Sequence, residues 1–283
     1  MDTYIFQLLL GLIQGLTEFF PVSSSGHLAL ANAIARSSGI TIPETTVLME
    51  VALHLATVLA VIAVFWRDLW HMIVALFRPA AGEGGYFKRL WGDPNGRLLI
   101  MVIIGTIPAA IAGALLASRI EAVFDEPRYI SLFLMITGVI LLVTFVLARG
   151  DKKLSELGIG FALMLGLAQA VALLPGISRS GATICMALFM GAIGTEAARF
   201  SLLLSLPAVL GAVAKKGLEL GTSGGSISLG LGLGFVVAFI VGYLTIRWLL
   251  VIMRNRRFVW FGVYCVIVGA VFFILTSTGM LSG

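Results

Sequence analysis

Residues 14–27 read Gln-Gly-Leu-Thr-Glu-Phe-Phe-Pro-Val-Ser-Ser-Ser-Gly-His, a polar stretch that separates two short apolar arms. Neither arm has the roughly 20 residues that a helix needs to cross about 30 Å of hydrocarbon. Irregular polar backbone at membrane depth is tolerated only where protein or a water-filled cavity surrounds it. The stretch therefore predicts that residues 4–36 form a re-entrant helix–loop–helix hairpin, which enters the membrane and returns to the same side.

A second hairpin of the same plan is predicted at residues 157–193. Its polar stretch reads Pro-Gly-Ile-Ser-Arg-Ser-Gly-Ala-Thr at 175–183. The two hairpins superpose at one constant offset, which pairs Gly11 with Gly166, Gln14 with Gln169, Ser23 with Ser178 and Gly26 with Gly181.

The rest of the chain is dominated by long apolar segments. Of the 283 residues, 59% are apolar and 12% are charged, against about 25% charged in a soluble domain. A soluble protein of this size cannot bury so much apolar surface, and polar–apolar alternation typical of a membrane β-barrel is missing. We therefore expect an all-α integral membrane protein with six transmembrane helices, at Val47–Trp66, Leu98–Leu116, Tyr129–Ala148, Ala197–Ala214, Leu229–Leu249 and Phe258–Thr276.

Each hairpin is followed by three of these segments. This divides the single membrane domain, 1–283, into repeat one at 1–150 and repeat two at 151–283. An odd number of crossings per repeat gives the second copy an inverted topology. Most Lys and Arg residues, including those of 149–153 and 254–257, then share one side, which the positive-inside rule makes cytoplasmic. We expect a multi-pass protein of the plasma (inner) membrane whose first hairpin, with the polar stretch it carries, opens to the outer face.

Charge and cysteine content exclude other classes. The net charge of +5 comes from cations scattered among loops, as the positive-inside rule gives, so nucleic acid is not an expected partner. The two cysteines, Cys185 and Cys265, lie far apart in apolar runs. They indicate neither a disulfide framework nor a metal site.

A carboxylate and an amide share one face of the first hairpin. Gln14 and Glu18 lie one helical turn apart. Their oxygens suit a hard divalent cation, Mg²⁺ or Ca²⁺, with Glu18 as the main ligand and Gln14 as a weaker one. An ionisable side chain at membrane depth indicates a function. The structural alternative is that Glu18 pairs only with a cationic side chain.

The loop after Pro21 is predicted to bind an anion. Proline ends the first arm, and hydroxyls with free N–H groups then stand at the start of the next helix. The structural alternative is that the serines only satisfy the helix ends. The residues concerned are Ser23, Ser24, Ser25, Gly26 and, on the first helical turn, His27.

In the second polar stretch, Arg179 stands where the first has Ser24. A guanidinium among hydroxyls and N–H groups at a helix start is typical of a phosphate clamp. A purely structural ion pair with Glu18 is the alternative, although such a buried pair stabilises a fold poorly. We expect both loops to meet near the midplane in one site. Further phosphate-binding candidates are Gly176, Ser178, Ser180 and Thr183.

Glu50 and His54 are candidates to face the same cavity. They lie one turn apart in the first long apolar segment. A buried carboxylate needs a reason, whereas a lone His on an apolar helix is more often a hydrogen-bonded interior residue. The interior role is therefore favoured for His54.

The two motifs together resemble the undecaprenyl-diphosphate phosphatase family, the bacitracin-resistance membrane phosphatases. The resemblance rests on Gln14-x-x-x-Glu18, on Pro-Val-Ser-Ser-Ser-Gly-His at 21–27 and on Pro-Gly-x-Ser-Arg-Ser-x-x-Thr at 175–183. It covers nearly the whole chain. It implies an enzyme that removes the terminal phosphate of undecaprenyl diphosphate, recycles the carrier lipid for cell-wall synthesis and confers bacitracin resistance.

The resemblance also implies residue roles. The family's proposed serine nucleophile falls on Ser24, its histidine on His27 and its phosphate-binding arginine on Arg179. In the mechanism this allows, Ser24 attacks the terminal phosphorus and His27 or Glu18 accepts its proton. The divalent cation and the guanidinium would stabilise the developing charge. Attack by His27 itself or by a metal-bound water stays open.

The competing interpretation is a secondary transporter or lipid flippase for an anionic substrate. Inverted repeats with broken helices are typical of transporters, but a transporter does not need a Ser–His pair beside a carboxylate. The expected partners are the isoprenoid diphosphate lipid and membrane lipid. A homodimer remains an open option.

Overall fold

The computed structural model describes residues 3–38, 46–78, 85–124, 126–148, 150–220, 228–255 and 258–280. These ranges contain 12 α-helices and one 3₁₀ helix, η1 (Leu154–Glu156), and no β-strand. The all-α membrane architecture is therefore confirmed for the described part of the chain. Arg149, Arg256 and Arg257, which entered the charge comparison above, lie outside the described residues.

Six helices are long and apolar enough to cross a membrane, as expected. Each covers most of one predicted segment. They are α3 (Thr46–Val64), α6 (Pro94–Phe124), α7 (Pro127–Leu147), α10 (Gly194–Leu220), α11 (Leu229–Arg254) and α12 (Val259–Ser277).

Helix α6 extends beyond its predicted segment, 98–116, at both ends. Pro94 is its first residue, where a missing N–H costs nothing. The Asp93 side chain accepts hydrogen bonds from the N–H groups of Asn95 (2.9 Å) and Gly96 (3.1 Å), which caps the helix. Apolar composition reports only the part of a helix that lies in hydrocarbon, so the prediction missed the polar ends.

The remaining helices are too short to be counted as spans. α1 and α2 flank the first polar stretch and pack against each other, and α8 and α9 do the same at the second. With 15 and 13 residues, α1 and α8 are each about 20 Å long. The short helices are α1 (Thr3–Thr17), α2 (Ser24–Ser37), α4 (Trp66–Phe77), α5 (Gly85–Gly92), α8 (Ile159–Val171) and α9 (Arg179–Phe189).

The first arm of each hairpin packs on a long helix from the other half of the chain. α1 lies along α11, and α8 lies along α6. A Cβ on Gly11 would lie 2.3 Å from the carbonyl oxygen of Gly234, and one on Gly166 would lie 2.3 Å from that of Gly105. Only glycine permits such close approach of two backbones, which is a common way for helices to associate in lipid.

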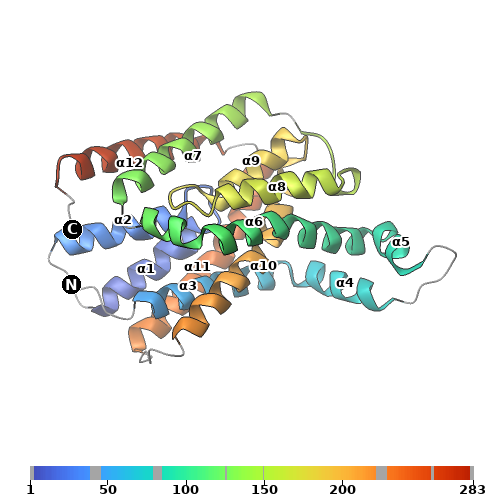
Figure 1. The fold of residues 1–283 in the computed structure, drawn as a ribbon, viewed down its shortest axis with the longest axis horizontal. Helices are drawn as coiled ribbons and strands as arrows, with labels where there is room; N and C mark the ends of the chain where they lie inside the picture. Colours follow the sequence, from blue (N-terminus) through green and yellow to red (C-terminus); the bar gives the residue numbers. More distant parts are fainter. Residues whose placement is uncertain are drawn as a thin grey trace.

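Figure 1 shows the helices aligned along the long axis of the molecule. α7 and α12 run side by side along one edge, and they are also in contact. The beginning of α1 and the end of α12 lie at one end of the molecule, whereas α4 and α5 lie at the opposite end (Figure 1). The two ends of the molecule along its helix axes therefore carry different elements.

The polar stretches of both hairpins lie inside the protein. Phe19, Phe20 and Val22 of the first loop belong to the main hydrophobic core. Buried polar side chains gather between these apolar groups. They include Gln14, Glu18, Ser23, Thr137, Gln169, Ser178, Ser180, Thr183 and Ser201.

Candidate active site

Glu18 lies at the centre of the site and joins the two hairpins. Its Oε2 accepts hydrogen bonds from Gln14 Nε2 at 3.0 Å and from Ser24 Oγ at 2.5 Å. Its Oε1 forms an ion pair with Arg179 Nη2 at 2.7 Å. Glu18 is only 7% exposed. The predicted meeting of the carboxylate, the middle serine and the arginine is therefore present, and so is the ion pair considered above as an alternative.

The first loop is held in a strained conformation at Ser23. This residue has φ +68°, the left-handed region, where a non-glycine residue costs roughly 1–2 kcal/mol. Its Oγ accepts a hydrogen bond from the N–H of Gly26 at 3.3 Å and so caps α2. The conformation places Ser24 at the start of α2, turned back toward Glu18.

The second loop is fixed by α7. The Ser178 side chain caps α9 by accepting from the N–H of Gly181 at 3.1 Å. The N–H of Ser178 donates to Thr137 Oγ1 at 3.1 Å, and this hydroxyl donates to the carbonyl of Gly176 at 3.0 Å. Gly176 has φ +95°, and a Cβ there would lie 2.3 Å from the Ile130 carbonyl oxygen. These contacts fix the backbone just before Arg179, which is the first residue of α9.

The two loops contact each other directly. Ser180 Oγ donates to the carbonyl oxygen of Phe20 at 3.1 Å. A Cβ on Gly26 would lie 3.4 Å from the Cα of Gly176, and one on Gly181 would lie 3.4 Å from the Cβ of Pro21. The loops therefore form one continuous site.

The predicted phosphate-binding residues fall into two groups. Ser24, Ser25, His27 and Arg179 are partly exposed, whereas the others are buried. Buried Thr183 donates to the Arg179 carbonyl at 2.7 Å and shares a 2.6 Å hydrogen bond with Ser201 Oγ. The buried group consists of Ser23, Gly26, Gly176, Ser178, Ser180 and Thr183.

His27 is positioned by Tyr264, a residue that sequence reasoning missed. Its Nδ1 lies 2.8 Å from the carbonyl oxygen of Ser23, so Nδ1–H donates there. Its Nε2 lies 2.8 Å from Tyr264 Oη, so the tyrosine hydroxyl donates to it. The two rings are nearly parallel, with centroids 5.6 Å apart. A single tyrosine in an apolar span such as α12 carries no pattern that would have revealed this contact.

Glu50 and His54 have different surroundings. Glu50 Oε2 forms an ion pair with Lys216 Nζ of α10 at 2.5 Å. The Nδ1 of His54 is 2.8 Å from the Glu50 carbonyl oxygen, as expected for an interior histidine. His54 also lies in the neighbourhood of Glu18. Thus His54 borders the site, while the Glu50 carboxylate is engaged with α10.

The oxygen donors at Glu18 fit a divalent cation only in part. The Gln14 amide turns its nitrogen, Nε2, toward the carboxylate, while its buried Oε1 has no hydrogen-bond partner among the described residues. Glu18 and Ser24 thus bring two oxygen donor groups together, and Gln14 would add a third only if its amide turned its oxygen toward them. No group of three or more His, Cys, Asp or Glu residues occurs in the described ranges. Such a partial set suits only a cation such as Mg²⁺, which usually keeps several water or phosphate ligands.

Comparisons with known proteins show which family the chain resembles. The model of the family described as bacitracin resistance protein BacA matches residues 7–271. An undecaprenyl-diphosphatase of Desulforapulum autotrophicum is 40% identical over 93% of this chain and 94% of its own length. Proteins with the same name from Methanobrevibacter smithii (39%, covering 96% of this chain and 97% of its own) and Salinibacter ruber (40%, covering 93% and 95%) are also similar.

Proposed function

Because the chain belongs to the BacA family of bacitracin resistance proteins, we propose that it hydrolyses undecaprenyl diphosphate to undecaprenyl phosphate and inorganic phosphate. The reaction recycles the carrier lipid for cell-wall synthesis and confers bacitracin resistance. One observation carries the proposal: a serine, a carboxylate and a guanidinium form one hydrogen-bonded cluster at the contact of two loops. These three groups can supply a nucleophile, a base and a stabiliser of developing charge for the hydrolysis of a phosphoric anhydride.

Ser24 is the proposed nucleophile, and Glu18 accepts its proton. Ser24 Oγ attacks the terminal phosphorus, the anhydride P–O bond breaks, and undecaprenyl phosphate leaves. Water then cleaves the phosphoserine and releases inorganic phosphate. The 2.5 Å contact from Ser24 Oγ to Glu18 Oε2 supports this assignment, since a general base must be within hydrogen-bond reach.

His27 is the proposed positioning residue for this loop. Both of its ring nitrogens are engaged, Nδ1 with the Ser23 carbonyl and Nε2 with Tyr264. Attack by His27 on phosphorus would require the Tyr264 contact to break. This argues for Ser24 over His27, while attack by an activated water is decided by the experiment below.

Arg179 is proposed to bind the terminal phosphate. A guanidinium has five N–H donors in a planar fork, and the ion pair to Glu18 uses Nη2. Other donors remain to hold phosphate oxygens and to stabilise the charge that develops in the transition state. A divalent cation held by Glu18, Gln14 and Ser24 would add Lewis-acid stabilisation of the same charge.

The two hairpins are proposed to be re-entrant parts of an inverted repeat, with repeat one at 1–150 and repeat two at 151–283. Two observations support this. α1 and α8 are too short to cross the hydrocarbon, and the packing of α1 on α11 is mirrored by that of α8 on α6. The proposed topology opens the site to the outer face of the plasma membrane.

The experiment measures phosphate release from undecaprenyl diphosphate by the purified protein in detergent, with Mg²⁺, with Ca²⁺ and with chelator. Ser24→Ala, Glu18→Gln and Arg179→Ala are each expected to lower the rate by about 10²-fold or more. Ser37→Ala, in the same helix as Ser24 but at its exposed end, is the matched control.

Each outcome separates the alternatives. Full activity of Ser24→Ala would move the attack to water or His27. Insensitivity to chelator would remove the divalent cation from the proposal. If the wild-type protein releases no phosphate, the transporter interpretation remains. A transporter has no substrate to carry between two compartments in detergent, so it would give no phosphate in this assay.

A further inference from the structure

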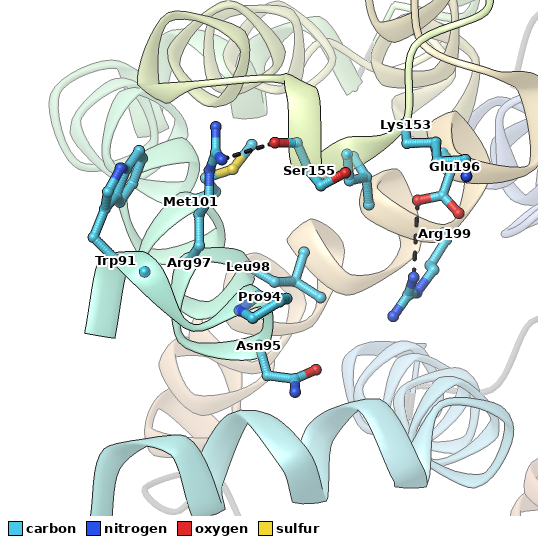
Figure 2. A pocket seen from close by; sticks show the side chains of 12 residues that line it. Trp91, Pro94, Asn95, Arg97, Leu98, Met101, Lys153, Ser155, Glu196 and Arg199 are labelled. Carbon is cyan, nitrogen blue, oxygen red and sulfur yellow. Dashed lines mark hydrogen bonds and ion pairs between the residues drawn. The ribbon is translucent and has the colours of Figure 1, made fainter. Parts of the chain in front are cut away.

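A cavity of about 420 Å³ lies at the end of the molecule that carries α4 and α5. It is bordered by the beginnings of α6 and α10 and by the segment around η1, and it contains no residue of the candidate active site. We call it the cationic pocket. Figure 2 shows its lining side chains, among them Trp91, Asn95, Arg97, Lys153, Glu196 and Arg199.

Arg97 brings an unneutralised charge to the cationic pocket. Its guanidinium donates to two backbone carbonyls, those of Ser155 (2.8 Å) and Leu157. No carboxylate pairs with it in the described part of the chain. Its Nε–H is buried and finds no acceptor there either. Three of its five N–H groups therefore make no hydrogen bond among the described residues, and its positive charge is unpaired there.

The other charges leave an excess of cations. Lys153 has no ion pair within the described ranges. Arg199 is shared between Asp68 and Glu196, the latter at 3.8 Å. The lining thus holds three cations against one carboxylate, with one more carboxylate behind Arg199.

An apolar groove of about 680 Å³ lies between α3, α4, α6 and α10. Thr106 is the one uncharged polar residue among its lining residues, and none of them is charged. A groove of this character on a membrane protein is a place for hydrocarbon chains. Residues that define it are Trp66, Ile73, Val102, Leu203, Pro207 and Leu210.

The cationic pocket and the apolar groove are neighbours. On α10, Arg199 lines the pocket and Leu203, one turn later, lines the groove. On α6, Met101 lines the pocket and the next residue, Val102, lines the groove. The ion pair between Arg199 and Asp68 joins the pocket to α4, which forms a wall of the groove.

Tryptophans mark this end as the level of the lipid head groups. Trp66 and Trp70 at the groove are 56% and 58% exposed. The guanidinium carbon of Arg97, Cζ, lies over the Trp91 ring at 4.9 Å from the ring centroid. Tryptophan is enriched at the membrane–water interface, where one edge is apolar and the other is hydrated.

We propose that the cationic pocket and the apolar groove together bind one anionic phospholipid of the bilayer. The phosphate-bearing head group lies in the pocket beside Arg97 and Lys153, and an acyl chain lies in the groove. Basic pockets between membrane helices are known to bind acidic head groups. The adjoining groove favours a lipid over free phosphate, and the excess of cations favours an anionic over a zwitterionic one.

The test is native mass spectrometry of the full-length protein in micelles that contain equal amounts of phosphatidylglycerol and phosphatidylcholine. The wild type is expected to retain phosphatidylglycerol preferentially. Lys153→Gln should lower that preference about fivefold, since one Lys or Arg near a surface contributes about 1 kcal/mol of attraction to anionic lipid. Lys88→Gln, at an exposed position of α5, is the matched control and should leave it unchanged.

A second pair of variants tests the groove. Ala110→Trp fills it and should reduce retention of both lipids. Ala114→Trp, at an equally exposed position of α6 that does not line the groove, should not. Equal retention of the two lipids by the wild type, or displacement of phosphatidylglycerol by inorganic phosphate, would overturn the proposal. So would preferential retention of undecaprenyl phosphate, which would assign the site to the reaction product.

Discussion

At the scale of single residues, Ser23 combines a strained backbone with a helix cap. Its counterpart Ser178 has the same capping role at φ −70°, without strain. Both serines accept from the N–H group three residues later. Because the two serines share the cap and differ in backbone conformation, substitutions at both positions separate the two contributions to stability.

We predict that Ser23→Gly stabilises the protein. Glycine relieves about 1–2 kcal/mol of left-handed strain, whereas replacing a capping serine by glycine costs only a few tenths of a kcal/mol. Ser178→Gly, the matched control, has no strain to relieve and should destabilise by about a few tenths of a kcal/mol. Thermal unfolding of the detergent-solubilised variants measures both. A lower melting temperature for Ser23→Gly than for the wild type would contradict the prediction.

At the scale of helices, close backbone contacts hold α8 against α6. We predict that Gly166→Ala destabilises by about 1–3 kcal/mol, the typical cost of overpacking, because its Cβ would lie 2.3 Å from the Gly105 oxygen. Gly160→Ala in the same helix meets nothing within 4 Å and should be neutral or slightly stabilising. Equal melting temperatures for the two variants would contradict the prediction, because they would show that α8 can move away from α6 without loss of stability.

The beginning of α6 should respond to pH through Asp93. Hydrogen bonds from the N–H of Gly96, and then of Asn95, lower the pKa of this carboxyl below its usual value of 3.8, and Arg78 adds to the effect. The stabilisation is therefore complete above that value and is lost as the pH falls through the lower, folded-state pKa. We predict that Asp93→Asn melts below the wild type at neutral pH, and that the difference shrinks on acidification below pH 3.8. A difference that grows on acidification would contradict the sign.

At the scale of the whole molecule, the proposed inverted repeat predicts which positions face which side. Ser37 at the end of α2 and Thr278 after α12 should lie outside, and Ser155 in η1 should lie inside. Cysteines placed there should react with a membrane-impermeant maleimide in intact cells at the first two positions, and only after permeabilisation at the third. The native cysteines, Cys185 and Cys265, are buried and give little background. Labelling of Ser37→Cys only after permeabilisation would show that the first hairpin crosses the membrane.

Much of this architecture could be predicted from the sequence, because apolar length alone identifies a membrane span and a polar interruption identifies a break in it. The meeting of the two polar loops was expected from the sequence, whereas the ion pair of Glu18 with Arg179 was considered there only as a structural alternative. Helices α4 and α5 were missed, since their short amphipathic sequences resemble a charged loop. Tyr264 was missed because its partner His27 is far away in sequence, and a single hydroxyl in an apolar helix gives no periodic signal.

The packing of α1 on α11 has a consequence for the order of assembly during synthesis. Gly11 leaves the ribosome well before its partner Gly234, which lies in the second half of the chain described here. Until then, the close-fitting face of the first hairpin has no native neighbour in the bilayer. Completion of the candidate active site is therefore a late event in biogenesis, and a nascent chain that stops before α11 carries Glu18 and Ser24 without the helix on which α1 packs.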